Sequence, residues 1–134
     1  MGTVRAESPA LTARDVGAVR QPRRLAFGRG PLPAGSELEL CAGPLEDELR
    51  RLADEGVQSL LLEGGPTLAG GFLRAGLIDK LVLFVAPKLI GGDDAPSLFA
   101  GPGAGALADA VPVSSLEAAR VGGDLLLTAY LREP

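Results

Sequence analysis

The chain contains no histidine and only one cysteine, Cys41, among its 134 residues. Without histidine it lacks the side chain that most often moves protons near neutral pH and most often binds zinc. A single cysteine cannot form an intramolecular disulfide, and it excludes a cysteine-rich metal site. Any chemistry must therefore use carboxylates, arginine, lysine, hydroxyls, backbone amides or a bound cofactor, and we expect no metal.

Aromatic residues are scarce, at 4% of the chain, and no apolar run approaches the ~18 residues that a membrane-spanning helix needs. The longest apolar run, Leu81 to Pro87, is typical of a buried strand. Hydrophobic residues make up 46% and charged residues 22%, as in ordinary globular proteins, and the length indicates one domain over 1–134. The N-terminus shows neither a signal-peptide pattern nor a myristoylation motif, so we expect a cytoplasmic location and no membrane partner.

Charge is distributed unevenly along the chain. The net charge of −4 argues against a dedicated nucleic-acid binder. Residues 1–30 nevertheless hold six arginines and two acids, while residues 31–134 hold seven basic and fifteen acidic residues. The basic third is either a solvated arm or a place where a few arginines bind a small anion such as phosphate.

Patterning in the first half predicts strands and one helix. Short strands are expected over Arg24–Phe27 and Glu37–Cys41. Apolar residues at helical spacing predict a helix over Pro44–Glu55, with Pro44 at the first helical position and Gly56 just past the end. A buried strand is expected over Val57–Leu62, followed by a tight turn at Glu63–Gly65.

The second half predicts a helix and three further strands. The helix is expected over Pro66–Ala75 and a buried strand over Leu81–Ala86. Residues 91–106 are rich in Gly, Ala, Pro and Asp and predict a loop. Val113–Arg120 and Leu125–Leu131 flank a glycine-containing turn and predict an antiparallel hairpin. The order of elements indicates an α/β fold with an antiparallel edge.

The segment Glu63-Gly-Gly-Pro-Thr-Leu-Ala-Gly-Gly71 carries the clearest chemical signal. A strand ends in a carboxylate, two glycines follow, and a helix begins at Pro66 with amides that lack internal partners. Those amides and the helix dipole favour an anion, so the segment is suited to a diphosphate. The alternative is an ordinary strand–turn–helix joint whose glycines serve packing. Likewise, Glu63 either contacts a ligand or simply ends the strand.

This segment and its continuation resemble a known family. Residues 63–81 and Ala86-Pro-Lys-Leu-Ile-Gly-Gly92 are similar to the C-terminal reductase domain of the bacterial bifunctional riboflavin biosynthesis protein, of the dihydrofolate-reductase-like family. Gly2-Thr-Val-Arg-Ala-Glu-Ser-Pro-Ala-Leu-Thr-Ala-Arg14 and Arg20-Gln-Pro22 are similar to further segments of it. The resemblance covers nearly the whole chain, with departures at Glu7-Ser8, Phe27-Gly28 and Lys80.

The resemblance implies an NADPH-dependent reductase that converts a ribosylamino-pyrimidine 5′-phosphate into its ribitylamino form. It implies a phosphorylated pyrimidine as the small-molecule partner and a homodimer. The cofactor would supply the hydride, and no catalytic side chain is assigned. Substrate-binding residues by this resemblance are Leu11, Arg14 and Glu63, with Arg14 meeting the phosphate. Cofactor-binding residues are Thr3, Glu7, Gly65, Pro66, Thr67, Leu68, Ala69, Gly70 and Gly71.

The resemblance also implies a fold class: a dihydrofolate-reductase-like mixed sheet flanked by helices, with a C-terminal antiparallel hairpin. The family's first strand and helix are missing from it, so the chain is expected to be a partial reductase domain. Without them we expect a poor reductase that self-associates or partly unfolds. The alternative function is a non-catalytic remnant or a cofactor-binding fragment of such a reductase.

Overall fold

The computed structural model describes residues 11–13, 17 and 20–133. The chain divides into two compact units, Met1–Gly65 and Pro66–Pro134. The predicted single domain over 1–134 stays a prediction. Among the described residues, no helix is long and apolar enough to cross a membrane.

The first unit contains a small parallel sheet. Strand β1 (Leu25–Phe27) pairs with β2 (Glu39–Cys41), with Leu25 opposite Glu39 and Phe27 opposite Cys41. Further backbone hydrogen bonds extend the ladder at both ends, from the Glu39 amide to the Arg24 carbonyl (2.9 Å) and from the Gly28 amide to the Cys41 carbonyl (3.0 Å). Both predicted strands are therefore confirmed, each slightly shorter than expected.

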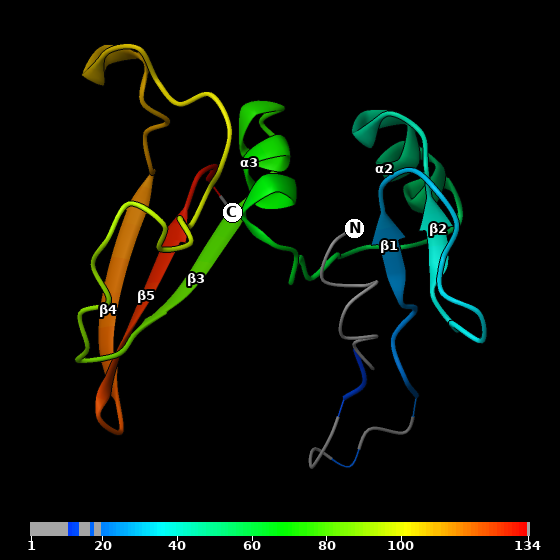
Figure 1. Cartoon of the computed structure of the whole chain (residues 1–134), viewed down its shortest axis with the longest axis horizontal. Coiled ribbons are helices and arrows are strands. Elements are labelled where there is room, and N and C mark those ends of the chain that lie inside the picture. The colour runs from blue at the N-terminus through cyan, green and yellow to red at the C-terminus, as the bar shows by residue number, and fades with distance from the viewer. Residues whose placement is uncertain (1–10, 14–16, 18–19, 134) are drawn as a thin grey trace. The chain divides into compact units, whose positions relative to one another are not determined.

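Helix α2 (Leu45–Asp54) follows the sheet (Figure 1). Pro44 precedes the helix instead of occupying its first position as predicted, because its ψ of 142° is extended. Gly56 ends the helix as expected, with a φ of +87° that favours glycine. Its amide donates to Ala53 (2.9 Å) and the Val57 amide donates to Leu52 (3.0 Å), which satisfies two of the last carbonyls.

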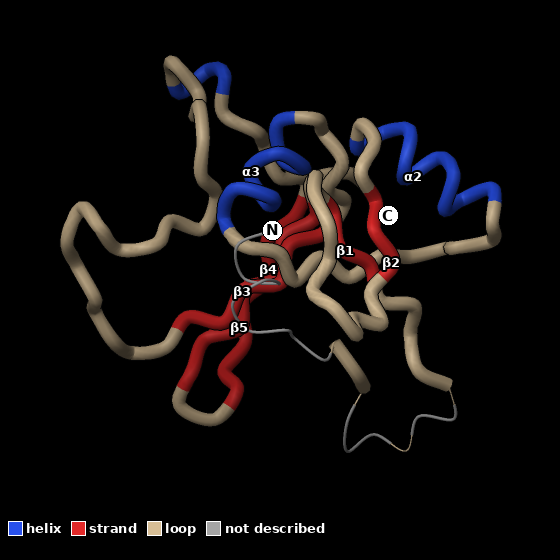
Figure 2. Tube along the Cα trace, turned by 45° about the vertical axis from the view of Figure 1, so that its right-hand side comes forward, coloured by secondary structure: helices blue, strands red, loops and turns tan. Residues whose placement is uncertain are grey.

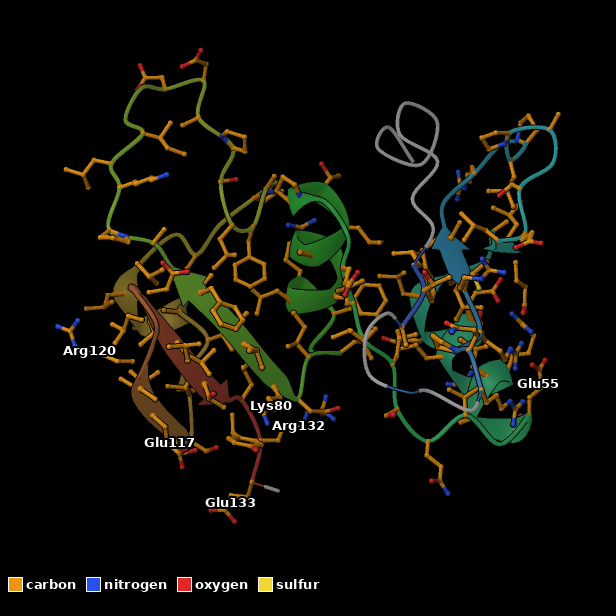
Figure 3. The ribbon with its side chains drawn as sticks, turned by 90° about the horizontal axis from the view of Figure 1, so that it is seen from below. Glu55, Lys80, Glu117, Arg120, Arg132 and Glu133 are labelled. Carbon is orange, nitrogen blue, oxygen red and sulfur yellow. The ribbon has the colours of Figure 1, made fainter. Side chains whose placement is uncertain are left out.

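A network of ion pairs joins α2 to β2 and to Arg23, two residues before β1. Arg51 contacts Glu39 (3.1 Å), Glu48 (3.0 Å) and Glu55 (2.7 Å), and Arg23 contacts Glu39 (2.7 Å) and Glu55 (2.8 Å). Figure 3 shows Glu55 at the end of α2. Beside this network lies the apolar core of the unit, made by Ala26, Phe27, Cys41 and Leu52.

The network alters the protonation of its members. Hydrogen bonds from Arg23, and then from Arg51, lower the pKa values of Glu39 and Glu55. The Gly43 amide, and then Arg51, lower the pKa of Glu48. Burial raises the pKa of the Cys41 thiol, which is 1% exposed. These carboxylates are therefore held in their charged form, while the cysteine is held neutral.

We predict that acid weakens this unit through the network. A carboxylate with a lowered pKa in the folded state stabilises the fold above its ordinary pKa of 4.5, and this stabilisation disappears as pH falls through the lower value. Arg51→Met removes the cation that three carboxylates share, so its melting temperature should fall less steeply with acid than that of the wild type. Melting curves from pH 7 to pH 3 measure this.

The matched control is Arg50→Met. Arg50 lies next to Arg51 in α2 and contacts Asp47 (3.0 Å) on the solvent side. This variant should keep the wild-type dependence on pH. Equal acid sensitivity of Arg51→Met and Arg50→Met would show that the network does not cause it.

The predicted strand Val57–Leu62 is wrong. Residues 57–65 form neither a strand nor the tight turn expected at Glu63–Gly65. Leu60 and Leu61 are 36% and 82% exposed. A strand needs a neighbouring backbone for its amides and carbonyls, and no described strand pairs with this segment. Among the described residues, the apolar run is therefore not paired with any strand.

The second unit consists of α3 (Pro66–Arg74) and a three-stranded antiparallel sheet of β3 (Lys80–Val85), β4 (Ser115–Val121) and β5 (Asp124–Tyr130). The strand order is β3-β5-β4, and α3 lies beside the sheet (Figures 1 and 2). Between β3 and β4 the chain contains only a short 3-10 helix, Leu107–Asp109. This confirms the predicted loop over 91–106 and the C-terminal hairpin, and with them a mixed α/β architecture.

Burial in this sheet differs from the sequence prediction. Leu81–Ala86 was expected to be buried on both faces, yet Val82 and Phe84 are 51% and 58% exposed. These two side chains alternate with Leu81 and Leu83, which are half-buried. The face of β3 that carries Val82 and Phe84 is therefore about half open to solvent. Ala129 of β5 and Phe72 of α3 are the buried apolar residues of this unit.

Candidate functional site

The N-terminus of α3 is the first candidate. Gly64 and Gly65 directly precede Pro66, and both glycines and Thr67 are exposed. A helix that begins at Pro66 cannot pair the amides of Gly65, Thr67 and Leu68 internally. Within the described part of the chain none of these amides donates to another group. The first turn therefore presents free donors to solvent, as the sequence predicts for an anion site.

Charge distinguishes this helix from α2, which also follows a Gly-Pro step. The first turn of α2 carries three acids, Glu46, Asp47 and Glu48, and Glu48 accepts the Gly43 amide (2.9 Å). The first turn of α3 carries no acid, and its last turn carries Arg74. At the start of α2, three carboxylates already lie near the positive end of the helix dipole and would repel an anion. The positive end of α3 has no such carboxylates in its first turn.

The second turn of α3 is arranged differently. Gly70 and Gly71 belong to the helix, and Gly70 is buried. A side chain at Gly70 would collide with the Ala100 carbonyl oxygen. This glycine therefore allows the chain around Ala100 to pass close to the helix. The assignment of Ala69, Gly70 and Gly71 to the cofactor stays a prediction, based on the resemblance.

The segment around Ala100 is fixed to α3 by two hydrogen bonds. The Ala100 amide donates to the Pro66 carbonyl (2.9 Å), and Nη1 of Arg74 donates to the Ala100 carbonyl (3.0 Å). In Figure 1 the connection between β3 and β4 passes beside α3. Sequence reasoning assigned Arg74 and Ala100 no role, because residues 26 positions apart give no local signal of their contact.

The predicted substrate residues are only partly described. Glu63 is exposed, and Leu11 is partly exposed with a φ of 45°, unusual for a residue other than glycine. Thr3, Glu7 and Arg14 lie outside the described residues, so their predicted roles stay predictions. The described residues contain no acidic or cysteine cluster that could hold a metal.

Gln21 is a residue whose role the sequence did not reveal. Its Oε1 accepts the Ala13 amide (2.9 Å) and its Nε2 donates to the Ala13 carbonyl (3.2 Å). The side chain thus pairs with Ala13 as a neighbouring strand would. It fixes the backbone two residues beyond Leu11, which is one of the predicted substrate contacts.

Together these features define an α/β protein with an open, acid-free helix N-terminus after a Gly-Gly step. The family model of the RibD C-terminal domain matches residues 36–127. The chain therefore belongs to the RibD C-terminal domain family.

Individual relatives agree with this membership. The chain is 38% identical over 148 residues to the riboflavin biosynthesis protein RibD of Mycobacterium tuberculosis, covering 98% of this chain and 41% of the relative. It is 32% identical to RibD of Bacillus amyloliquefaciens, covering 98% of this chain and 45% of that protein. It is 38% identical over 79 residues to the 2,5-diamino-6-ribosylamino-4(3H)-pyrimidinone 5′-phosphate reductase of Methanothermobacter thermautotrophicus, covering 59% of this chain and 37% of that one.

Among solved structures, RibD of Acinetobacter baumannii matches with a TM-score of 0.81 at 24% identity. The match covers 96% of this chain and 44% of that one, which confirms the predicted dihydrofolate-reductase-like fold class. The chain spans less than half the length of these RibD relatives.

We predict that Gly70→Ala destabilises the second unit. The new methyl group would meet the backbone of Ala100, which must move. Overpacking of this kind costs about 1–3 kcal/mol in the free energy of unfolding. Urea denaturation measures it. Gly103→Ala is the control, because a Cβ at Gly103 would meet nothing within 4 Å. Equal stability of the two variants would contradict the close contact.

Proposed function

We propose that this chain is the reductase part of a riboflavin biosynthesis protein. It binds NADPH with the diphosphate at the start of α3, and reduces a ribosylamino-pyrimidine 5′-phosphate to its ribitylamino form. The support is membership of the RibD C-terminal domain family, together with the reductase named among its relatives.

The observation that carries the proposal is the contrast between the two helix starts. Both helices start at a Gly-Pro step, yet of the two only α3 has a first turn that is free of acids and has unpaired amides within the described chain. Amides and a positive helix end bind phosphate oxygens without a cationic side chain. Exposed Gly65 lets a diphosphate approach the backbone closely.

The bound cofactor would supply the hydride, which adds to the anomeric carbon of the opened ribose. The residues of the chain then bind the cofactor and the substrate and orient them. Thr67 and Leu68 donate their amides to the diphosphate, and Glu63 accepts hydrogen bonds from the polar end of the substrate. We propose further that Thr3 and Glu7 lie beside the cofactor, and that Leu11 and Arg14 contact the substrate.

We expect Gly65→Asp to weaken NADPH binding. The new carboxylate would stand against the diphosphate and block close approach of the cofactor to the backbone. The dissociation constant should rise at least about tenfold, which corresponds to about 1.4 kcal/mol. Fluorescence titration of the full chain measures it, with Gly103→Asp, at an open loop position, as the control. Equal affinity of wild type and Gly65→Asp for NADPH would contradict the assignment of the diphosphate to this turn.

We expect Arg14→Ala to raise the substrate's Michaelis constant. Loss of one hydrogen-bonding partner of a charged phosphate costs about 1.5–3 kcal/mol. Steady-state kinetics on the phosphorylated substrate and on its dephosphorylated form separate the phosphate contact from other effects. Arg120→Ala, an exposed arginine on β4, is the control. If Arg14→Ala behaves like this control on both substrates, Arg14 is a solvated surface charge.

The homodimer is also a proposal. Its support is the apolar face of β3 in the second unit, where Val82 and Phe84 are about half exposed. Exposed apolar patches of this kind are often covered by a partner. Light scattering after size-exclusion chromatography measures the mass in solution, and a monomer at micromolar concentration would contradict the dimer.

A further inference from the structure

The contact between α3 and the segment around Ala100 is unusually close for a loop. Two glycines create the space: a Cβ on Gly70 would collide with the Ala100 carbonyl oxygen, and a Cβ on Gly101 would lie 2.6 Å from Nη1 of Arg74. Gly101 also has a φ of +102°, which side chains rarely adopt. Arg74 therefore lies against Gly101, a position whose backbone conformation favours glycine. We call Gly70, Arg74, Ala100 and Gly101 the Arg74 clamp.

The clamp acts on one particular peptide group. The Ala100 amide donates to the Pro66 carbonyl at 2.9 Å. That carbonyl and the Thr67 amide belong to the same peptide unit, and they point in opposite directions. When a peptide carbonyl accepts a hydrogen bond, the unit is polarised and its amide becomes a better donor. The clamp thus both fixes the orientation of the Thr67 amide and strengthens it as a donor.

Arg74 completes this chain of interactions. Its Nη1 donates to the Ala100 carbonyl at 3.0 Å, so a cation in the last turn of α3 holds the loop over the first turn. A charged donor forms a stronger hydrogen bond than a neutral one. The path runs from Arg74 through Ala100 to Pro66 and the Thr67 amide. Every member lies in the second unit.

We propose that Arg74 is a positioning residue for the binding of a dinucleotide diphosphate at the start of α3. It touches no ligand itself and acts through Ala100 and the Pro66–Thr67 peptide. The inference rests on the proposed function, since it concerns the same site. The inference adds Arg74, in the last turn of α3, and the loop around Ala100 to a site that is otherwise made by the first turn of the helix.

The experiment compares Arg74→Ala and Arg74→Lys in the full chain with wild type, using NADPH as the probe. Arg74→Ala should raise the dissociation constant about three- to tenfold, the effect of one lost hydrogen bond. Turnover at saturating NADPH should stay within about twofold of wild type. Arg74→Lys keeps a charged donor and should recover part of the affinity. Arg120→Ala, on β4, is the control.

Hydrogen exchange at the Ala100 amide supplies the second readout. It should quicken in Arg74→Ala, in step with the loss of affinity, while melting temperature reports any general loss of stability. Faster exchange at Ala100 with unchanged NADPH affinity overturns the positioning role, because the loop has then loosened without effect on the site. A fall in turnover and melting temperature with unchanged affinity overturns it as well. If wild type itself does not bind NADPH, the proposed function fails first, and this inference fails with it.

Discussion

The pairing of β5 on both of its edges organises the second unit. Its backbone forms antiparallel ladders with β3 on one side and β4 on the other, and Ala129, near the end of β5, is 5% exposed. The chain just after β5 remains bonded to the segment before β3, because the Leu131 amide donates to the Asp79 carbonyl (2.8 Å). Arg132 then donates to the Gly76 carbonyl, just past the end of α3. Figure 3 shows Arg132 beside Lys80, at the start of β3.

This arrangement explains how a short helix can present a defined N-terminus. Its last turn is closed by Gly76, whose amide donates to Leu73 (3.0 Å), and by the Leu77 amide, which donates to Phe72 (2.9 Å). Its first turn is held by the Ala100 amide. Both ends of α3 are thus hydrogen-bonded to neighbouring segments of the second unit, while the Gly65, Thr67 and Leu68 amides have no partner among the described residues. In the first unit, ion pairs connect the helix to the strand instead. Arg51 and Arg23 bind three carboxylates, which belong to β2, to α2 and to the residue just after α2.

Local chemistry in the sequence predicted most elements, and long-range packing decided the others. Proline before a helix and glycine after it placed α2 and α3 to within a residue or two, because these residues act through their own backbone angles. The hairpin followed from its turn. Val57–Leu62 failed because apolar composition predicts a strand only where a neighbouring backbone is available for pairing.

The candidate site shows the same division. The exposed donors of the first turn of α3 follow from Gly-Gly-Pro alone. For Gly70 the structure shows the packing role that the sequence left open as an alternative, and the sequence did not reveal which residue it packs against. Gly70 meets Ala100, 30 positions away in the chain, and no local pattern reports such a contact. The ligating role of glycine and its packing role are identical in sequence. Only the neighbouring atoms distinguish them.

The hairpin turn has a consequence for the order in which the second unit folds. Val121 pairs with Asp124 across Gly122 and Gly123, so β4 and β5 can meet after the closure of a two-residue loop. Hairpins of this kind form in about 1–10 μs. By contrast, β3 must find β5 across the long glycine-rich connection, with Val85 opposite Leu125, and loop closure over that span costs more entropy. We therefore expect the hairpin to form first and to provide the edge on which β3 pairs.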